Sequence, residues 1–393
     1  MRKILFTSLM LMSLSLAAQK TTTMPDVVLE METSTSMNFT ENDFEQMAFK
    51  MDRVRLGFKG HLGDHTSYHF RTTFHKSYDK YSVDNISKAV ELAKVMYAPS
   101  EKWDFAAGKM FVVHGGYENY VNVLLVREFT DFNSNIEVYK TGVQGTYHKS
   151  DDHHFTFQVV NNRSVSHNEL FAYPLPDGIQ ASKVPFLATF NWDGYFADKT
   201  VRLLYSASAS QVAQGKYMYY ITTGNIYEKG PVLAYFDVMY TRAQVDKNQR
   251  LTSLFGGPVA QNVQYLTLIA DFEYQFTPKW NAYVKGAYET ANVYKDNGMY
   301  KKGHYLTTWN AQACVEWLPF TKEKGLKFYL HYVYKGNQLQ DVASAFNAFI
   351  PDTQRISLGL TYIIPVLSRI LRLCSLIFSS SSFILTTIFW ISV

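Results

Sequence analysis

The chain has 393 residues, a length that fits either two soluble domains or one large barrel. Charged residues make up 18% of it, below the roughly 25% of ordinary globular domains, whereas aromatic residues reach 16%, with 28 Tyr and 28 Phe. Two cysteines exclude a disulfide framework, and 38 Lys and Arg against 34 Asp and Glu exclude the strongly basic balance of a nucleic-acid-binding chain. Such a composition is typical of a membrane β-barrel.

The N-terminus predicts a secretory signal peptide over residues 1–18. Arg2 and Lys3 precede an apolar run, which ends at the small residues Ala17 and Ala18. This run is too short to span a membrane as a helix. The sequence therefore predicts export of a mature chain, with a barrel over residues 19–367.

The segment from Met51 to Lys76 alternates strictly between apolar and basic residues. Such a period of two predicts two β-strands, and Gly63 with Asp64 supplies the turn between them. Val54, Leu56 and Phe58 share the apolar face. The opposite face carries Arg53, Arg55, Lys59, His61, His69, Arg71 and His75.

The same alternation recurs along the chain and predicts about 16 strands. Beyond the hairpin, they are expected at 26–39, 88–98, 103–110, 136–148, 154–162, 185–196, 200–210, 217–227, 231–244, 262–276, 280–293, 304–318, 326–335 and 353–364. Long and short connections alternate between them, and the strands are longer than the roughly 5 to 6 residues usual in soluble sheets. This pattern predicts an all-β fold, a transmembrane antiparallel β-barrel with long external loops and short periplasmic turns.

Strand parity predicts which charged side chains line the lumen. The inward set adds Lys140, Arg202, Lys285, Lys327, His331, Lys335 and Arg355 to the basic face of the hairpin, and Asp271, Glu273, Glu289 and Glu316 as acids. The basic strip could concentrate anions, more strongly once the histidines charge near pH ~6.5. Alternatively, the arginines could pair with the loop carboxylates of Glu118, Glu128 or Asp131. Both interpretations remain open at this point.

Residues 92–135 resemble the most characteristic segment of the phosphate-selective porin O and P family. In that family a strand ending in a glycine and a basic residue precedes a short glycine-containing run, an acid and a folded inner loop. Gly108 and Lys109 match the first pair, and Gly115, Gly116 and Glu118 match the second. A proline often found before that glycine is absent, and Val113 and His114 stand there instead.

The resemblance implies a trimeric 16-stranded outer-membrane porin whose third external loop constricts the channel. That loop is expected at residues 111–135, although it could instead lie over the barrel mouth. Its candidate constriction residues are His114, Gly115, Gly116, Glu118, Arg127 and Glu128. The implied function is passive diffusion of small hydrophilic solutes, with a mild preference for phosphate-like anions. The implied partners are outer-membrane lipid, small solutes and two further copies of the chain, without nucleic acid and without a cofactor.

Other features of the sequence favour no further chemistry. A cluster of His148, Asp151, Asp152, His153 and His154 lies in a predicted periplasmic turn, and no metal site is expected there. No catalytic motif supports the rival hypothesis of a barrel enzyme of lipase or protease type. A structural or adhesive surface barrel is the third hypothesis. The apolar tail, residues 368–393, does not fit the barrel and is interpreted as unrelated to the fold or as an abnormal reading of the gene.

Overall fold

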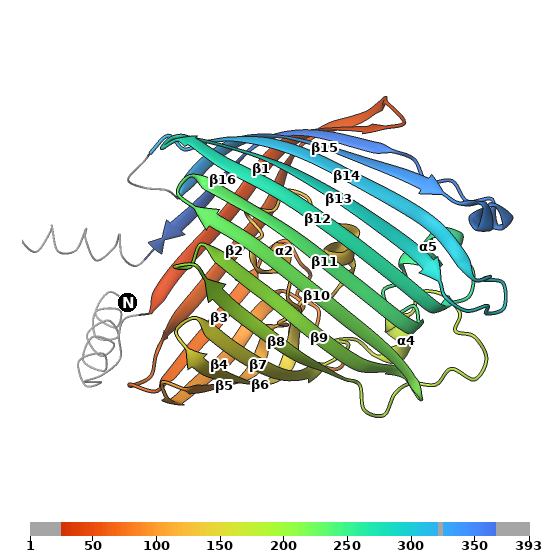
Figure 1. The fold of residues 1–393 in the computed structure, drawn as a ribbon, viewed down its shortest axis with the longest axis horizontal. Coiled ribbons are helices and arrows are strands. Elements are labelled where there is room, and N and C mark those ends of the chain that lie inside the picture. The colour runs from red at the N-terminus through yellow and green to blue at the C-terminus, as the bar shows by residue number, and fades with distance from the viewer. Residues whose placement is uncertain (1–24, 321–324, 367–393) are drawn as a thin grey trace, which may run out of the picture.

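Sixteen antiparallel strands form one closed barrel in the computed structural model, which describes residues 25–320 and 325–366 (Figure 1). Each strand pairs with its neighbours in sequence, and β16 pairs with β1 to close the sheet. The predicted fold is confirmed. The proposed signal peptide and tail lie outside the described residues. The strands are β1 (Asp26–Thr40), β2 (Asp43–His61), β3 (Thr66–Thr73), β4 (Val90–Ser100), β5 (Trp103–Phe111), β6 (Tyr139–Ser150), β7 (His153–Asn161), β8 (Phe186–Phe196), β9 (Val201–Ala213), β10 (Lys216–Lys229), β11 (Val232–Val245), β12 (Gln261–Thr277), β13 (Trp280–Val293), β14 (Gly303–Trp317), β15 (Leu326–Leu339) and β16 (Thr353–Pro365).

The two faces of the sheet meet different surroundings, as the alternation predicts. The outward side chains of Val284 and Leu330 are 57% and 54% exposed, whereas their inward neighbours Lys285 and His331 are buried. An apolar outer face and a polar inner face suit a wall between lipid and an aqueous interior. None of the described helices is long and apolar enough to span a membrane.

Two expectations are wrong: one concerns where the first strands end, and the other concerns the alternation of connection lengths. The ten residues expected as a loop before the hairpin belong to β1 and β2, which are joined by a two-residue turn at Glu41 and Asn42 with φ of 50° and 72°. Bulges opposite Glu32/Thr33 and Asn38/Phe39 interrupt the period of two in β2, which hid the strand from sequence reasoning. The connection between β9 and β10 is also short, so long and short connections do not alternate strictly.

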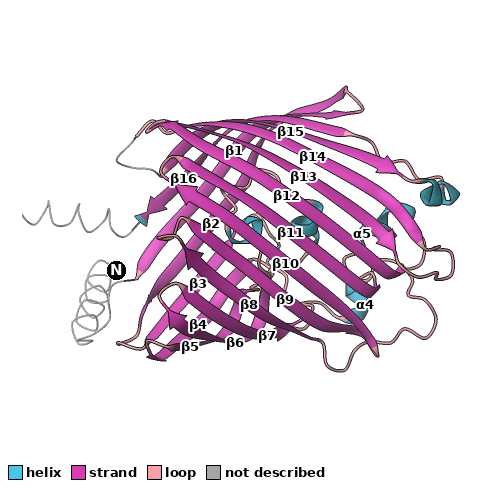
Figure 2. Ribbon diagram, viewed as in Figure 1, coloured by secondary structure: helices cyan, strands magenta, loops and turns pink. Residues whose placement is uncertain are grey.

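Short helices occur in the long connections (Figure 2). They are α2 (Tyr117–Tyr120), α3 (Asp131–Asn135), α4 (His167–Leu170), α5 (Arg250–Phe255) and the 3-10 helix η1 (Asp341–Phe346). The largest buried apolar cluster includes Leu251 of α5, Tyr265 and Tyr305, and Phe346 packs against it. It fixes the loops to the inside of the wall, and α2 and α3 belong to the connection from β5 to β6.

Candidate functional site: a loop folded through the lumen

Residues 112–138, here called the inner loop, enter the barrel through a tight bend at two glycines. Gly115 and Gly116 have φ of 72° and 73°, and an added Cβ would collide with Thr222 on the first and with Met239, at 2.5 Å, on the second. Only glycine fits here without strain. The carbonyl of His114 accepts a hydrogen bond from the Thr222 hydroxyl. Burial is the main cause that lowers the pKa of His114 to about 3, so its imidazole is neutral.

Glu118 fixes the inner loop to the far wall. Its carboxylate is fully buried and lies 2.8 Å from the ammonium of Lys285 on β13. The same carboxylate accepts a hydrogen bond of 2.8 Å from the Thr130 hydroxyl, and the backbone N–H of Glu118 donates to Asp237 of β11 at 2.9 Å. Lys285 also donates to the carbonyl of Glu128 at 2.6 Å. This predicted lumen cation therefore holds the loop.

Arg127 joins the inner loop to three strands. Its guanidinium is 2.8 Å from Glu32 of β1 and 3.0 Å from Glu316 of β14, and it lies 3.8 Å from the ring centre of Tyr329 on β15. The side chain is only 2% exposed. Glu316 also pairs with Lys327 at 2.9 Å. The loop thus contacts opposite sides of the wall, which places it inside the barrel and not over its mouth.

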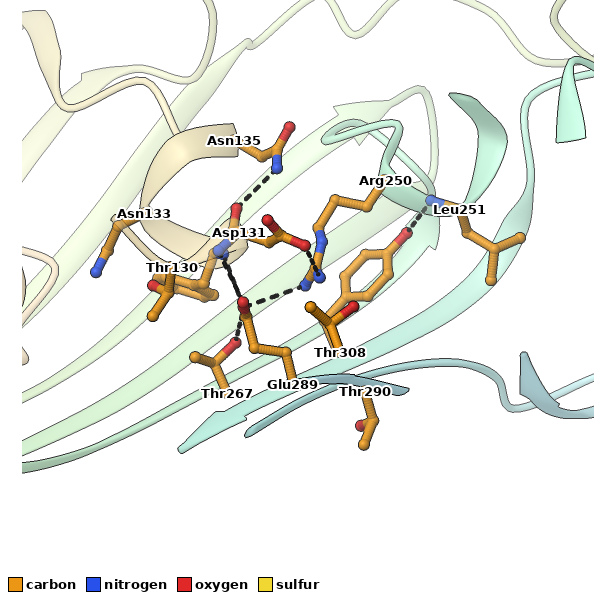
Figure 3. Close-up of polar contacts among 12 residues, drawn as sticks. Thr130, Asp131, Asn133, Asn135, Arg250, Leu251, Thr267, Glu289, Thr290 and Thr308 are labelled. Carbon is orange, nitrogen blue, oxygen red and sulfur yellow. Dashed lines mark hydrogen bonds and ion pairs between the residues drawn. The ribbon is translucent and has the colours of Figure 1, made fainter. Parts of the chain in front are cut away.

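Helix α3, which is part of the inner loop, contacts α5. Arg250 of α5 lies between Asp131 of α3 and Glu289 of β13 (Figure 3). Its guanidinium is 2.9 Å from the Asp131 carboxylate and 3.7 Å from that of Glu289. The backbone N–H of Asp131 donates to Glu289 at 2.9 Å. Burial alone would raise the pKa of Asp131, but the charges of Arg250 and Lys335 hold that pKa below its usual range. This end of the loop is fixed by charge.

Most of the predicted basic set is paired with acids. Several of these acids were not identified from the sequence, above all Glu32 of β1 and Glu91 of β4, which flank the basic hairpin. The pairs are Arg53–Glu32 (3.4 Å), Arg55–Glu91 (3.0 Å), Arg71–Glu91 (3.0 Å), Lys59–Asp26 (3.6 Å), Lys140–Glu137 (2.5 Å), Arg202–Asp193 (2.8 Å), Arg355–Glu128 (2.6 Å) and Lys335–Asp131. Pairing therefore uses wall glutamates as well as the loop carboxylates that the sequence analysis considered.

The histidines of the hairpin lie in three different environments. His61 is exposed at the end of β2, and His69 lies across from Lys59 in the β2–β3 register. His75 lies beyond the last residue of β3, so its expected place on the strand is wrong; its ring is 2.5 Å from the Thr73 hydroxyl. Burial, followed by the charge of Lys76, lowers the pKa of His75. His331 is buried on β15.

Two cavities beside the inner loop carry an excess of positive charge, one against β15, β16, β1 and β2 and the other against β2 to β6. The first, of about 180 Å³, is lined by four cations, Lys50, Arg53, Arg127 and Arg355, and two carboxylates, Glu32 and Asp52. The second, of about 290 Å³, is lined by Arg55 and Arg71 and by no acid among the residues that the structure describes. Together they are called the basic cavities. Lys50 was missed from the sequence because the bulge in β2 turns it inward.

The histidine cluster noted in the sequence is divided between two strands, with His148 on β6 and His153 and His154 on β7. The Nδ1 atoms of His148 and His154 are 2.7 Å apart and His148 Nε2 lies 2.7 Å from Asp104, whereas His153 stacks on Trp192. In the parts of the chain that the structure describes, no group of three His, Cys, Asp or Glu could hold a metal ion.

A closed sheet with an apolar outer face, a polar interior and a loop folded through that interior defines a transmembrane channel of the porin type. Residues 33–364 match the family model described as phosphate-selective porin O and P. The chain therefore belongs to this family of outer-membrane porins, and the resemblance seen in the sequence is confirmed.

Solved structures share the fold over most of this chain. The outer-membrane channel DcaP of Acinetobacter baumannii is 12% identical, with 88% of this chain and 99% of that chain covered and a TM-score of 0.62. The anion-selective porin from Comamonas acidovorans is 10% identical, with 87% and 100% covered and a TM-score of 0.59. OmpT of Vibrio cholerae, in a trimer form, is 13% identical, with 88% and 100% covered and a TM-score of 0.53. A comparison with curated proteins found no match.

Proposed function

We propose that the protein lets small hydrophilic solutes diffuse passively across the outer membrane beside the inner loop, with a mild preference for anions, phosphate-like ones among them. One observation carries the proposal: the basic cavities are lined by six Lys and Arg side chains and only two carboxylates. Positive charge in a narrow passage with a low-dielectric wall raises the local concentration of anions.

The preference is mild because most of this charge is locally compensated. Arg53 and Arg127 share Glu32, and Arg55 and Arg71 share Glu91. A paired guanidinium has a short-range field, and an anion that approaches it competes with the carboxylate. Lys50 is different, since it is in no ion pair of the described chain and faces the first basic cavity.

Selectivity is tested by reversal potentials in planar bilayers under a KCl gradient. We expect an anion-to-cation permeability ratio above one, reduced toward one by Lys50→Gln with Arg53→Gln. Lys199→Gln with Lys279→Gln, in two short turns between strands, removes the same charge away from the lumen and should leave the ratio unchanged. A clear cation preference of the unaltered barrel would overturn the proposal.

The same recordings separate this proposal from its rivals. A folded barrel without conductance would favour a structural or adhesive surface protein. The family match favours a non-enzymatic channel over a barrel lipase or protease.

The proposed assembly is a homotrimer in outer-membrane lipid. It is supported by the family resemblance and by the trimer form of one structural neighbour. Chemical cross-linking of the purified barrel in detergent tests it, with a ladder that stops at three copies as the expected result.

A further inference from the structure

A third cavity, of about 140 Å³, lies on the other side of the inner loop from the basic cavities. Val121 of the loop lines both this cavity and the second basic cavity, so the loop separates them. Its lining holds three tyrosines, apolar side chains of the loop and the wall, the carboxylates of two β12 residues, Asp271 and Glu273, and one cation, Lys285. It is here called the acidic aromatic cavity.

The cation in this lining, Lys285, is held by partners other than the two carboxylates. Lys285 is the cross-strand neighbour of Asp271, but its ammonium is held by Glu118 at 2.8 Å and by the inner-loop backbone. Glu273 accepts a hydrogen bond of 2.7 Å from the Asn281 amide. Neither Asp271 nor Glu273 is in an ion pair of the described chain. Both carboxylates are half-buried, and the one ammonium beside them is already paired with Glu118, so the cavity is electrostatically suited to receive a further cation.

Aromatic rings form the rest of the cavity. The rings of Tyr117 and Tyr235 meet edge to face at 5.0 Å. Tyr283 is only 8% exposed, and its hydroxyl, apart from the thiol of Cys314 beside it, has no hydrogen-bond partner in the described chain. A cavity of about 150 Å³ is known to hold one benzene molecule, and tyrosine faces attract cations. The volume therefore matches one aromatic ring, and the two carboxylates in the lining can pair with a charged amine attached to that ring.

We propose that the acidic aromatic cavity binds an organic ammonium with one aromatic ring, with its charge at Asp271 and Glu273 and its ring among Tyr117, Tyr235 and Tyr283. The uncompensated carboxylates supply the attraction, and the tyrosines supply the contact with the ring. The site is independent of the anion preference proposed above. One loop thus separates an anion-favouring side of the lumen from a side that retains aromatic amines.

The test is calorimetric titration of the folded full-length barrel in detergent, which does not depend on conductance. Benzylammonium is the probe, benzyl alcohol has the ring without the charge, and methylammonium has the charge without the ring. We expect saturable binding of benzylammonium, about tenfold or more tighter than either comparison compound, because only it makes both kinds of contact. Absence of saturable binding, or equal binding of benzyl alcohol or methylammonium, would overturn the proposal.

Substitutions locate the site. Asp271→Asn with Glu273→Gln should weaken benzylammonium binding about tenfold or more, since two charged contacts are lost. Asp52→Asn with Glu30→Gln removes two lumen carboxylates near the opposite wall and should leave the affinity within about twofold. If both double variants lose the same benzylammonium affinity, or if the first double variant loses none, this cavity is excluded as the site. Folding of each variant is checked by its heat-dependent mobility in gel electrophoresis. If the first double variant does not fold, the comparison of the three probes on the unaltered chain still decides whether the proposal holds.

Discussion

Arg127→Gln should release the inner loop from the wall. Removing one member of a buried ion pair costs about 3 to 5 kcal/mol, because the other charge remains buried without its partner. Here Glu32 keeps Arg53 at 3.4 Å, and Glu316 keeps Lys327 at 2.9 Å. The lower value, about 3 kcal/mol, is therefore expected, and at about 1.4 kcal/mol per factor of ten it raises the population of undocked loop roughly 100-fold.

Single-channel recording and limited proteolysis measure this release. We expect brief conductance fluctuations and faster cleavage within residues 112–138, while the barrel keeps its heat-dependent mobility. Arg242→Gln is the matched control, because this arginine stacks on Tyr294 at 4.3 Å and forms no ion pair with any residue that the structure describes. A folded Arg127→Gln barrel with steady current and unchanged protease resistance would refute the reasoning.

Three further predictions concern the same loop and its surroundings. Because the pKa of Asp131 is lowered in the folded barrel, its pairing with Arg250 stabilises the loop at every pH above the unfolded pKa of about 4. This stabilisation is lost as the pH falls through the lower pKa of the folded barrel. Proteolysis of the loop should therefore accelerate in that acid range, and the acceleration should be smaller in Asp131→Asn. Because the pKa of His75 is lowered, its imidazole should gain charge only below pH ~6.5. The anion preference should therefore stay flat between pH ~7.5 and ~6.5 and rise below that range. His75→Gln should weaken this rise, as measured by the reversal potential. Gly116→Val combines a left-handed backbone with the collision at Met239, so a strain of about 1 to 3 kcal/mol should give conductance fluctuations like those of an undocked loop.

The strands were predictable because their signal is local. Each alternates between lipid and lumen, so a few consecutive residues of β13 or β15 reveal both faces, and the predicted limits of β13 agree with the structure. A bulge removes this information, because it shifts the parity by one residue. Lys50 and Arg53 line one cavity although parity assigns them to opposite faces.

The partners of the lumen charges were not predictable from one sequence. Arg55 meets Glu91, which is 36 residues away, and Arg127 meets Glu316, which is 189 residues away. Barrel closure and the path of the inner loop bring these distant residues into contact, and the periodicity of the sequence contains no information on either. The family resemblance located the loop, but it did not indicate which carboxylate would hold Arg127.

Paired and unpaired cations in this lumen therefore have different roles. A paired residue such as Arg355, 2.6 Å from Glu128, contributes to the field and also holds the inner loop, so its replacement changes selectivity and loop position together. Within the described residues Lys50 has no ion-paired carboxylate to release, and its replacement changes the field alone. It follows that the unpaired cations report most directly on ion preference, whereas the arginines report first on the stability of the loop that divides the channel.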